Sequence, residues 1–160
     1  MRLVVADTSP IFYLLSIDHI DLLPRLFGKI ILPDAVHREL CHPAAPALAR
    51  EWAARLPGWV ELTPVETTDD AALRSLGAGE RAAITLALAL HADLILIDER
   101  KGTKAALSKG FEVAGTLGVL SLAARRGLVD LADSFARLKR TNFRYRQEIM
   151  EALLDQHPSE

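Results

Sequence analysis

Two aspartates, Asp7 and Asp98, each follow a short run of apolar residues, at positions 3–6 and 94–97. Runs that are apolar at every position are typical of strands in a parallel sheet that helices cover on both faces. Ligands of such sheets bind in the crevice outside the carboxyl ends of the strands, so carboxylates at two neighbouring strand ends would share one cleft. Adjacent carboxylates repel each other, and a pair that stays ionised at neutral pH is typical of a site for a divalent cation.

Two glutamates have a helical spacing that directs them toward the same cleft. Glu39 follows Val36 by three positions in a predicted helix and so shares its apolar side, and Glu80 precedes Ile84 by one turn in a helix predicted over residues 79–91. A turn, a cap, a helix N-terminus or a surface ion pair would also explain each of the four acids alone. One shared site explains all four together, and we therefore predict such a site.

The elements that must position these acids alternate along the chain. Besides the two strands named above, strands are predicted over residues 29–32, 59–62 and 111–114, with helices between them. This alternation favours a three-layer α/β/α sandwich around a central, mostly parallel sheet of about five short strands. We expect residues 1–160 to form a single domain, with a helical C-terminal extension from about residue 130.

Charge is distributed unevenly along the chain, although its net charge is only −2. Residues 100–146 carry eleven Lys or Arg and three acids, a net charge of +8, whereas the other residues sum to −10. An acidic pocket with a basic margin suits an enzyme that uses cations to act on a polyanion. Ordinary solvated helix faces are the competing interpretation.

The amino-acid composition argues against several kinds of site and against a membrane-spanning segment. One cysteine, Cys41, allows neither an internal disulfide bond nor a thiolate metal cluster, and the five histidines lack metal-ligand spacing. We find no leader segment and no apolar run long enough to span a bilayer, so we expect a soluble cytoplasmic protein without a membrane partner.

The C-terminal region has two further features with more than one interpretation. Residues 135–145 interleave Phe143 and Tyr145 with basic side chains, which could hold single-stranded RNA or pack between helices. The apolar stripe that begins at Ile149 could cover the body of the chain, a second copy or an antitoxin peptide.

Four segments together resemble the PIN-domain ribonucleases, especially a branch close to the VapC-type toxins of toxin-antitoxin pairs. They are VADTSP at residues 5–10, LPDAVHREL at 32–40, GAGERAAI at 77–84 and LIDERK at 96–101. The resemblance covers residue 3 to about residue 127, and GTLGVL at 115–120 is similar to the same branch. Each motif is short, so the resemblance rests on their order and spacing.

The resemblance implies a PIN-like fold and a metal-dependent endoribonuclease that hydrolyses RNA phosphodiester bonds, with Mg²⁺ or Mn²⁺ as cofactor. The implied catalytic and metal-binding residues are Asp7, Glu39, Glu80 and Asp98, with Glu99 as a further candidate ligand. The candidates for holding a substrate phosphate are Thr8, Ser9, Lys101 and Lys104. A toxin role, with RNA as substrate and a cognate antitoxin as partner, follows from the same branch, and we also expect a homodimer.

The chain departs from that branch at two positions, and two other functions stay open. Glu99 stands where we expect a second Asp, and Thr103 where we expect a basic residue. The first alternative is a catalytically weak PIN-fold scaffold that binds a partner. The second is a receiver-like signalling domain that accepts a phosphoryl group, although such a domain would place several acids together after the first strand, where Asp7 stands alone.

Overall fold

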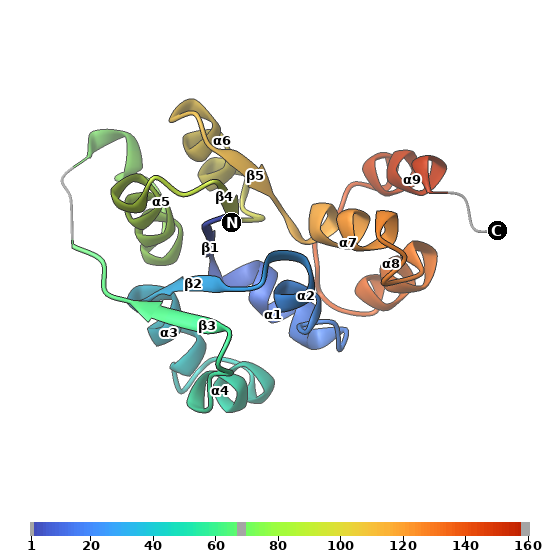
Figure 1. Ribbon diagram of the computed structural model, residues 1–160, viewed down its shortest axis with the longest axis horizontal. Helices are drawn as coiled ribbons and strands as arrows, with labels where there is room; N and C mark the ends of the chain where they lie inside the picture. The colour runs from blue at the N-terminus through green and yellow to red at the C-terminus, as the bar shows by residue number, and fades with distance from the viewer. Residues whose placement is uncertain (1, 67–69, 158–160) are drawn as a thin grey trace.

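A five-stranded parallel sheet forms the centre of the computed structural model, which describes residues 2–66 and 70–157. The strands are β1 (Val4–Ala6), β2 (Ile30–Pro33), β3 (Val60–Thr63), β4 (Leu94–Leu96) and β5 (Glu112–Ala114). Their order in the sheet is β3-β2-β1-β4-β5, and every neighbouring pair is parallel (Figure 1). The predicted α/β sandwich is confirmed, and each strand begins and ends within one residue of its predicted bounds.

Helices contribute to two hydrophobic cores, one on each face of the sheet. The first core contains residues of α1 (Thr8–Ser16), α2 (Leu22–Phe27), α3 (Asp34–Cys41), α4 (Ala47–Ala54), α7 (Thr116–Arg125), α8 (Leu131–Lys139) and α9 (Gln147–Gln156). The second contains residues of the short 3-10 helix η1 (Ala71–Leu73), α5 (Ala78–Leu90) and α6 (Arg100–Ser108). In the described part of the chain, no helix has the length and apolar character needed to cross a membrane.

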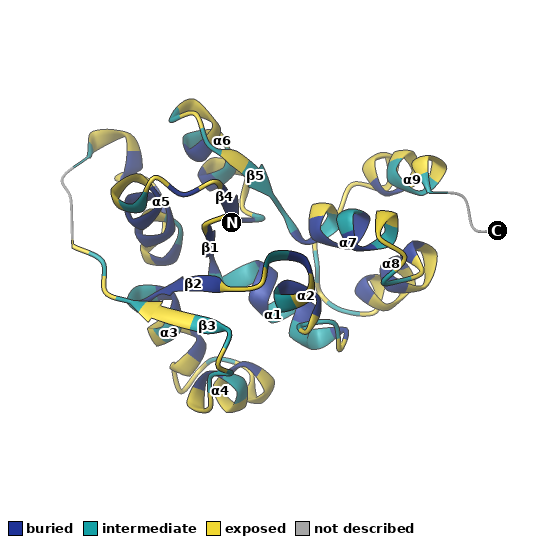
Figure 2. Ribbon diagram, in the orientation of Figure 1, coloured by how far each residue is buried: buried dark blue, intermediate teal, exposed yellow. Residues whose placement is uncertain are grey.

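The apolar runs of the sequence correspond to strands that are buried on both faces. Val4 and Ala6 belong to the first core, whereas Val5, between them, belongs to the second. The central strands β1, β2 and β4 are buried along their whole length, and the edge strand β3 is half-buried or exposed (Figure 2). Because successive side chains of a strand point to opposite faces, a strand covered on both faces needs apolar residues at every position.

The order of the strands places one pair at a topological switch point. From β1 the chain moves outward through β2 to β3, and it then returns to β4 on the other side of β1. Residue Asp7 directly follows β1, and its backbone N–H donates to the Leu96 carbonyl at the end of β4, at 2.9 Å. Ligands of open parallel sheets bind in the crevice at such a switch point. The acids that follow β1 and β4 are therefore in the expected position for a functional site.

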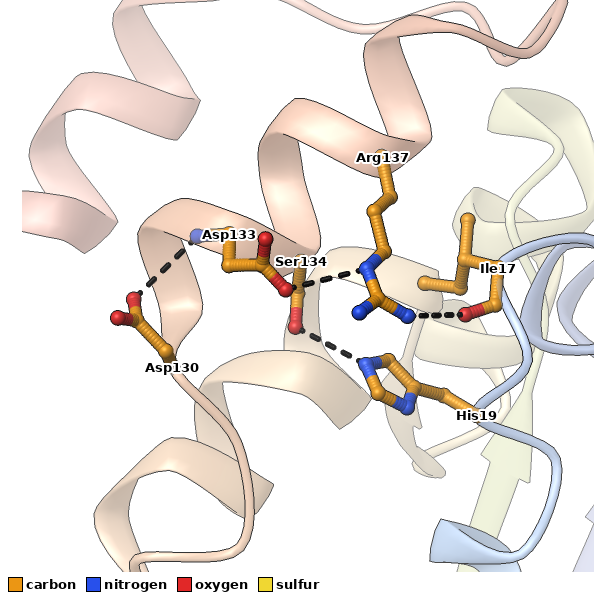
Figure 3. A network of polar contacts seen from close by, with 6 residues as sticks. All are labelled: Ile17, His19, Asp130, Asp133, Ser134 and Arg137. Carbon is orange, nitrogen blue, oxygen red and sulfur yellow. Dashed lines mark hydrogen bonds and ion pairs between the residues drawn. The ribbon is translucent and has the colours of Figure 1, made fainter.

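Polar contacts hold α8 against the segment between α1 and α2 (Figure 3). The Arg137 guanidinium donates to the Ile17 carbonyl at 3.3 Å and forms an ion pair with Asp133 at 3.1 Å. The Ser134 hydroxyl lies 3.4 Å from Nε2 of His19. The contacts of Ser134 and Arg137 attach α8 to this segment, and the Asp133 ion pair within α8 orients the Arg137 side chain.

Candidate functional site

A pocket of about 1310 Å³ lies at the carboxyl ends of β1 and β4. The side chains of all four predicted carboxylates line it, and so does the further candidate Glu99. The acids come from four separate segments of the chain, and they are Asp7, Glu39, Glu80 and Asp98. The structure therefore brings the predicted acids together around one common hollow.

Asp7 is the most deeply buried acid of the pocket, with only 3% of its surface exposed. Its Oδ1 atom is buried and accepts no hydrogen bond from any described residue. The pKa of Asp7 is raised to about 8, chiefly by burial and further by the charges of Glu80, Glu39 and Asp98, against the lowering effect of a backbone hydrogen bond at Thr8. An ionised carboxylate in this environment is costly unless a cation accompanies it.

Asp98 has very different surroundings. Its Oδ1 accepts a hydrogen bond from the Thr116 amide at 2.6 Å, and its Oδ2 accepts from the Thr116 hydroxyl at 2.7 Å and from the Ser9 hydroxyl at 3.0 Å. Burial raises the pKa of Asp98 above its usual value, and these hydrogen bonds offset only part of that rise. Asp98 does not cap the helix that follows it, because the carboxylate of Glu99 accepts the hydrogen bond from the Gly102 amide instead, at 3.0 Å.

Glu39 reaches the pocket from α3, but it is not buried as its sequence spacing predicted. Val36 and Leu40 of the same helix are buried, whereas Glu39 is exposed. Glu39 therefore points into the shared pocket, as its spacing predicted, but its side chain is exposed and not enclosed with the apolar residues of the helix. Its Oε2 instead accepts a hydrogen bond from the Thr8 hydroxyl at 2.6 Å. Glu39 thus lines the pocket from its solvent-exposed side.

Glycines in the first turn of α5 and just before it allow the acids to approach each other. A Cβ atom on Gly79 would lie 2.8 Å from an oxygen of Glu39 and 2.9 Å from Oδ1 of Asp7. A Cβ atom on Gly77 would lie 2.5 Å from Oε2 of Glu80. A larger residue at either position would force these carboxylates to move. The space around the carboxylates therefore depends on the absence of side chains there.

The donor set suits a hard divalent cation. The pocket offers a buried carboxylate oxygen without a partner among the described residues and three more carboxylates, which are the ligands that Mg²⁺ and Mn²⁺ prefer. No three Asp, Glu, His or Cys side chains of the described residues are close enough together to hold one ion. Mg²⁺ usually keeps several water molecules and binds through one or two carboxylates, so this arrangement fits such an ion.

The predicted phosphate-binding residues are divided between the pocket and the surface. Thr8, Ser9 and Lys104 line the pocket, whereas Lys101 is exposed and does not. Arg100 lines the pocket with Lys104, four residues further along α6. Residues four apart share one side of a helix, and the adjacent Lys101 is rotated away from that side. Helix α6 therefore contributes Arg100 and Lys104 to the basic lining of the pocket.

Sequence reasoning missed one part of the site and left the role of another part open. The first is Thr116, which makes two of the hydrogen bonds to Asp98 and begins the helix directly after β5, the neighbour of β4. Its place after a strand was the available signal, because the carboxyl ends of parallel strands meet at one edge. The second is the segment 143–146, for which the sequence allowed either RNA binding or packing between helices and whose side chains line the same pocket. Its interleaved aromatic and basic residues were the available signal.

Nearly the whole chain is similar to one known protein family. A family model described as a PIN domain matches residues 3–159. No curated relative matches the chain. The receiver-like alternative disagrees with the strand order, because β3 lies outside β2, whereas in receiver folds of the flavodoxin type the third strand lies beside the first.

Proposed function

This chain belongs to the PIN-domain family, whose members are generally nucleases, and from that premise we propose that it is a Mg²⁺- or Mn²⁺-dependent endoribonuclease. One observation carries the proposal: Oδ1 of Asp7 is buried, without a partner among the described residues, in a pocket lined by three more carboxylates. A carboxylate oxygen buried in this way needs a cation or a proton to compensate its negative charge. The surrounding acids favour the cation at neutral pH, because a single proton would neutralise only one of them.

In this proposal Asp7 and Asp98 are the principal ligands of the ion. Glu39 and Glu80 orient its water molecules. When bound, one or two divalent cations supply a water that is nucleophilic near pH 7 and stabilise negative charge on the phosphate oxygens. Asp98 is held in one orientation by Thr116 and Ser9, which gives the ligand set a fixed direction.

The remaining pocket residues either orient the acids or bind the substrate. The hydroxyls of Thr8 and Ser9 already donate to Glu39 and Asp98, so their role is to orient those acids. Binding of a phosphate then falls to cationic side chains that line the pocket, and Lys104 is the predicted one. Glu99 caps α6, which accounts for its carboxylate without a second ion.

The test is cleavage of single-stranded RNA by the purified chain. We expect cleavage with Mg²⁺ or Mn²⁺ and none with EDTA. The variants Asp7→Asn and Asp98→Asn should each cleave at least about a hundredfold more slowly, because a metal-supported transition state loses a ligand. Asp155→Asn, which changes an exposed aspartate of α9 that does not line the pocket, is the matched control and should cleave normally. Unchanged rates in both pocket variants would remove Asp7 and Asp98 from the mechanism.

The similarity of the motifs to VapC-type proteins supports a more specific role, which we propose as well: the chain is the toxin of a toxin-antitoxin pair. A cognate antitoxin and a homodimer belong to this proposal. Expression of the chain should arrest growth, Asp7→Asn should not, and a small neighbouring gene should relieve the arrest. RNA cleavage without growth arrest, and without such a neighbour, would favour a processing nuclease. Binding of a partner without any cleavage would favour a PIN-fold scaffold.

A further inference from the structure

The loop of residues 140–146, between α8 and α9, carries side chains that the proposed function has not used. Phe143, Arg144, Tyr145 and Arg146 line the acidic pocket, and they also line a second pocket of about 350 Å³. The 140–146 loop therefore forms a wall shared by the two pockets. It also brings two arginines to a hollow whose other charged lining residues are mostly acids.

One part of the loop is anchored to the body of the protein. The Phe143 ring packs edge-on against the Tyr13 ring, with 4.9 Å between the ring centroids. The Tyr13 hydroxyl donates to Oδ1 of Asn142 at 2.9 Å, and the Phe143 amide donates to the Thr141 hydroxyl oxygen at 3.1 Å. Tyr13 lies on α1, the helix that begins with Thr8 in the pocket. These contacts fix the loop relative to the acids.

The next part of the loop presents side chains that the fold does not use. Tyr145 is 40% exposed, and Nζ of Lys139 lies 5.6 Å from the centre of its ring. Arg144 is exposed and forms no ion pair in the described part of the chain. Arg146 pairs only with the exposed Glu148, at 3.4 Å. An ion pair this exposed adds little to stability.

These residue types match the chemistry of a nucleic-acid chain. Guanidinium groups bind phosphates through two parallel hydrogen bonds, and an exposed aromatic ring offers a face on which a base can stack. If Arg144 served only to neutralise the pocket acids, it would pair with one of them. It does not, although its charge is close enough to Tyr13 to lower the pKa of that hydroxyl, against the larger effects of burial and Asp98.

We propose that the 140–146 loop is a substrate-binding element that holds the RNA strand beside the acidic site. Arg144 and Arg146 bind phosphates that flank the one to be cleaved, and Tyr145 stacks on a base. Phe143 serves as the anchor and makes no contact with RNA. This inference rests on the proposed nuclease function and adds to it residues that lie outside the sheet and its acids.

Binding without cleavage tests the proposal most directly. The affinity of the full chain for a fluorescent single-stranded RNA is measured in EDTA, by anisotropy, over a range of salt concentrations. Arg144→Ala and Arg146→Ala should each weaken binding by roughly three- to tenfold and reduce the salt dependence of log K by about 0.7 for each phosphate that is no longer bound. Tyr145→Ala should weaken binding by about tenfold, and Tyr145→Phe should restore it because the ring is kept.

The matched control is Arg125→Ala, which removes an exposed arginine from the last turn of α7 that lines neither pocket. It should bind as the wild type does. With Mg²⁺ present, Arg144→Ala should raise KM with little change in kcat, because it removes binding that substrate and transition state share. Circular dichroism and melting should be unchanged in all these variants, since the altered side chains are exposed.

The outcomes separate this inference from the nuclease function. The inference fails if the wild type does not bind RNA, or if the Arg144, Arg146 and Tyr145 variants all bind with wild-type affinity and salt dependence. In either case, cleavage by the wild type with Mg²⁺ and its loss in Asp7→Asn would still support the nuclease, because the binding assay is done in EDTA. Conversely, binding that depends on the loop in a chain that never cleaves RNA would support the inference and overturn the nuclease.

Discussion

Asp7 and Asp98 occupy equivalent places, after two neighbouring parallel strands, but the fold treats them differently. Asp98 accepts three hydrogen bonds from Thr116 and Ser9, whereas Oδ1 of Asp7 is buried without a partner among the described residues. Asp98 is therefore oriented by three hydrogen bonds, whereas Asp7 is held by packing and by one backbone hydrogen bond at Thr8. Two acids of one type, placed by one sheet edge, thus acquire distinct properties.

The energetic consequence is that hydrogen bonds offset part of the cost of ionising Asp98, whereas Asp7 has little such compensation. Hydrogen bonds to a carboxylate are among the stronger ones, and they favour the ionised form of Asp98. The ionised form of Asp7 lacks most of this compensation, while the charges of Glu80 and Glu39 oppose it. A ligand that binds only the folded state stabilises that state, so a cation at Asp7 would offset the cost.

The largest expected effect is a loss of stability of the metal-free chain as the pH rises. Because the folded-state pKa of Asp7 is raised from 3.8 to about 8, the fold retains a proton that the unfolded chain releases. The contribution of Asp7 to stability is complete below about pH 4 and is lost as the pH rises through about 8. The free energy of unfolding should fall by roughly 2 to 5 kcal/mol over this range, measured by urea unfolding in EDTA.

Two variants and one ligand sharpen that measurement. Asp7→Asn should remove most of the pH dependence and raise stability at pH 8, because the amide carries no charge. Asp98→Asn should lower stability at pH 8 by roughly 1 to 2 kcal/mol, because an amide nitrogen would replace an oxygen that accepts hydrogen bonds. Mg²⁺ should stabilise the wild type at pH 8. Identical responses of the two variants would show that the aspartates are equivalent after all.

The next effect concerns the approach of Asp7 and Glu39 over Gly79. In Gly79→Ala the new methyl group would lie within 2.9 Å of oxygens of both carboxylates, so these must move apart. We expect Mg²⁺ affinity, measured by calorimetry, to fall roughly tenfold, as for other changes beside metal ligands. The stability of helix α5 itself should increase, because Ala is favoured over Gly in helices by about 1 kcal/mol.

Gly118→Ala is the matched control for this prediction. Gly118 also lies in a helix, α7, and a Cβ atom there would meet only the Ala114 side chain, at an ordinary 3.4 Å. Mg²⁺ affinity should therefore be unchanged in Gly118→Ala. Equal affinities in the two glycine variants would mean that Asp7 and Glu39 do not act together on the ion.

The sheet and the positions of Asp7 and Asp98 could be predicted because their signals are local. An apolar run that ends in an acid is visible in a few consecutive residues, and burial of β1 and β4 on both faces leaves little freedom in composition. The exposure of Glu39 could not be predicted in the same way. Its helix spans only eight residues, Asp34–Cys41, so a few apolar positions define the buried side poorly.

The remaining features of the site depend on the rotational phase of a helix or on contacts between segments that are distant in the sequence. Lys101 was a candidate and Arg100 was not, because the rotation of α6 depends on where the helix begins, and Glu99 sets that start by capping it. One residue of offset rotates a side chain by about 100°. The contacts of Thr116 with Asp98 and of the 140–146 loop with the pocket join segments whose pairing no short pattern encodes.

The smallest expected effect tests how Asp98 obtains its orientation. Thr116→Val removes the hydroxyl that donates to Oδ2 but keeps the shape of the side chain and the amide that donates to Oδ1. Cleavage should slow by roughly three- to tenfold, with a stability loss of about 1 kcal/mol or less, and Thr116→Ser should restore the rate because it keeps the hydroxyl. A wild-type rate in Thr116→Val would mean that the backbone amide and Ser9 suffice to orient Asp98. The contrast with Asp7 would then originate in the start of α7 rather than in the threonine side chain.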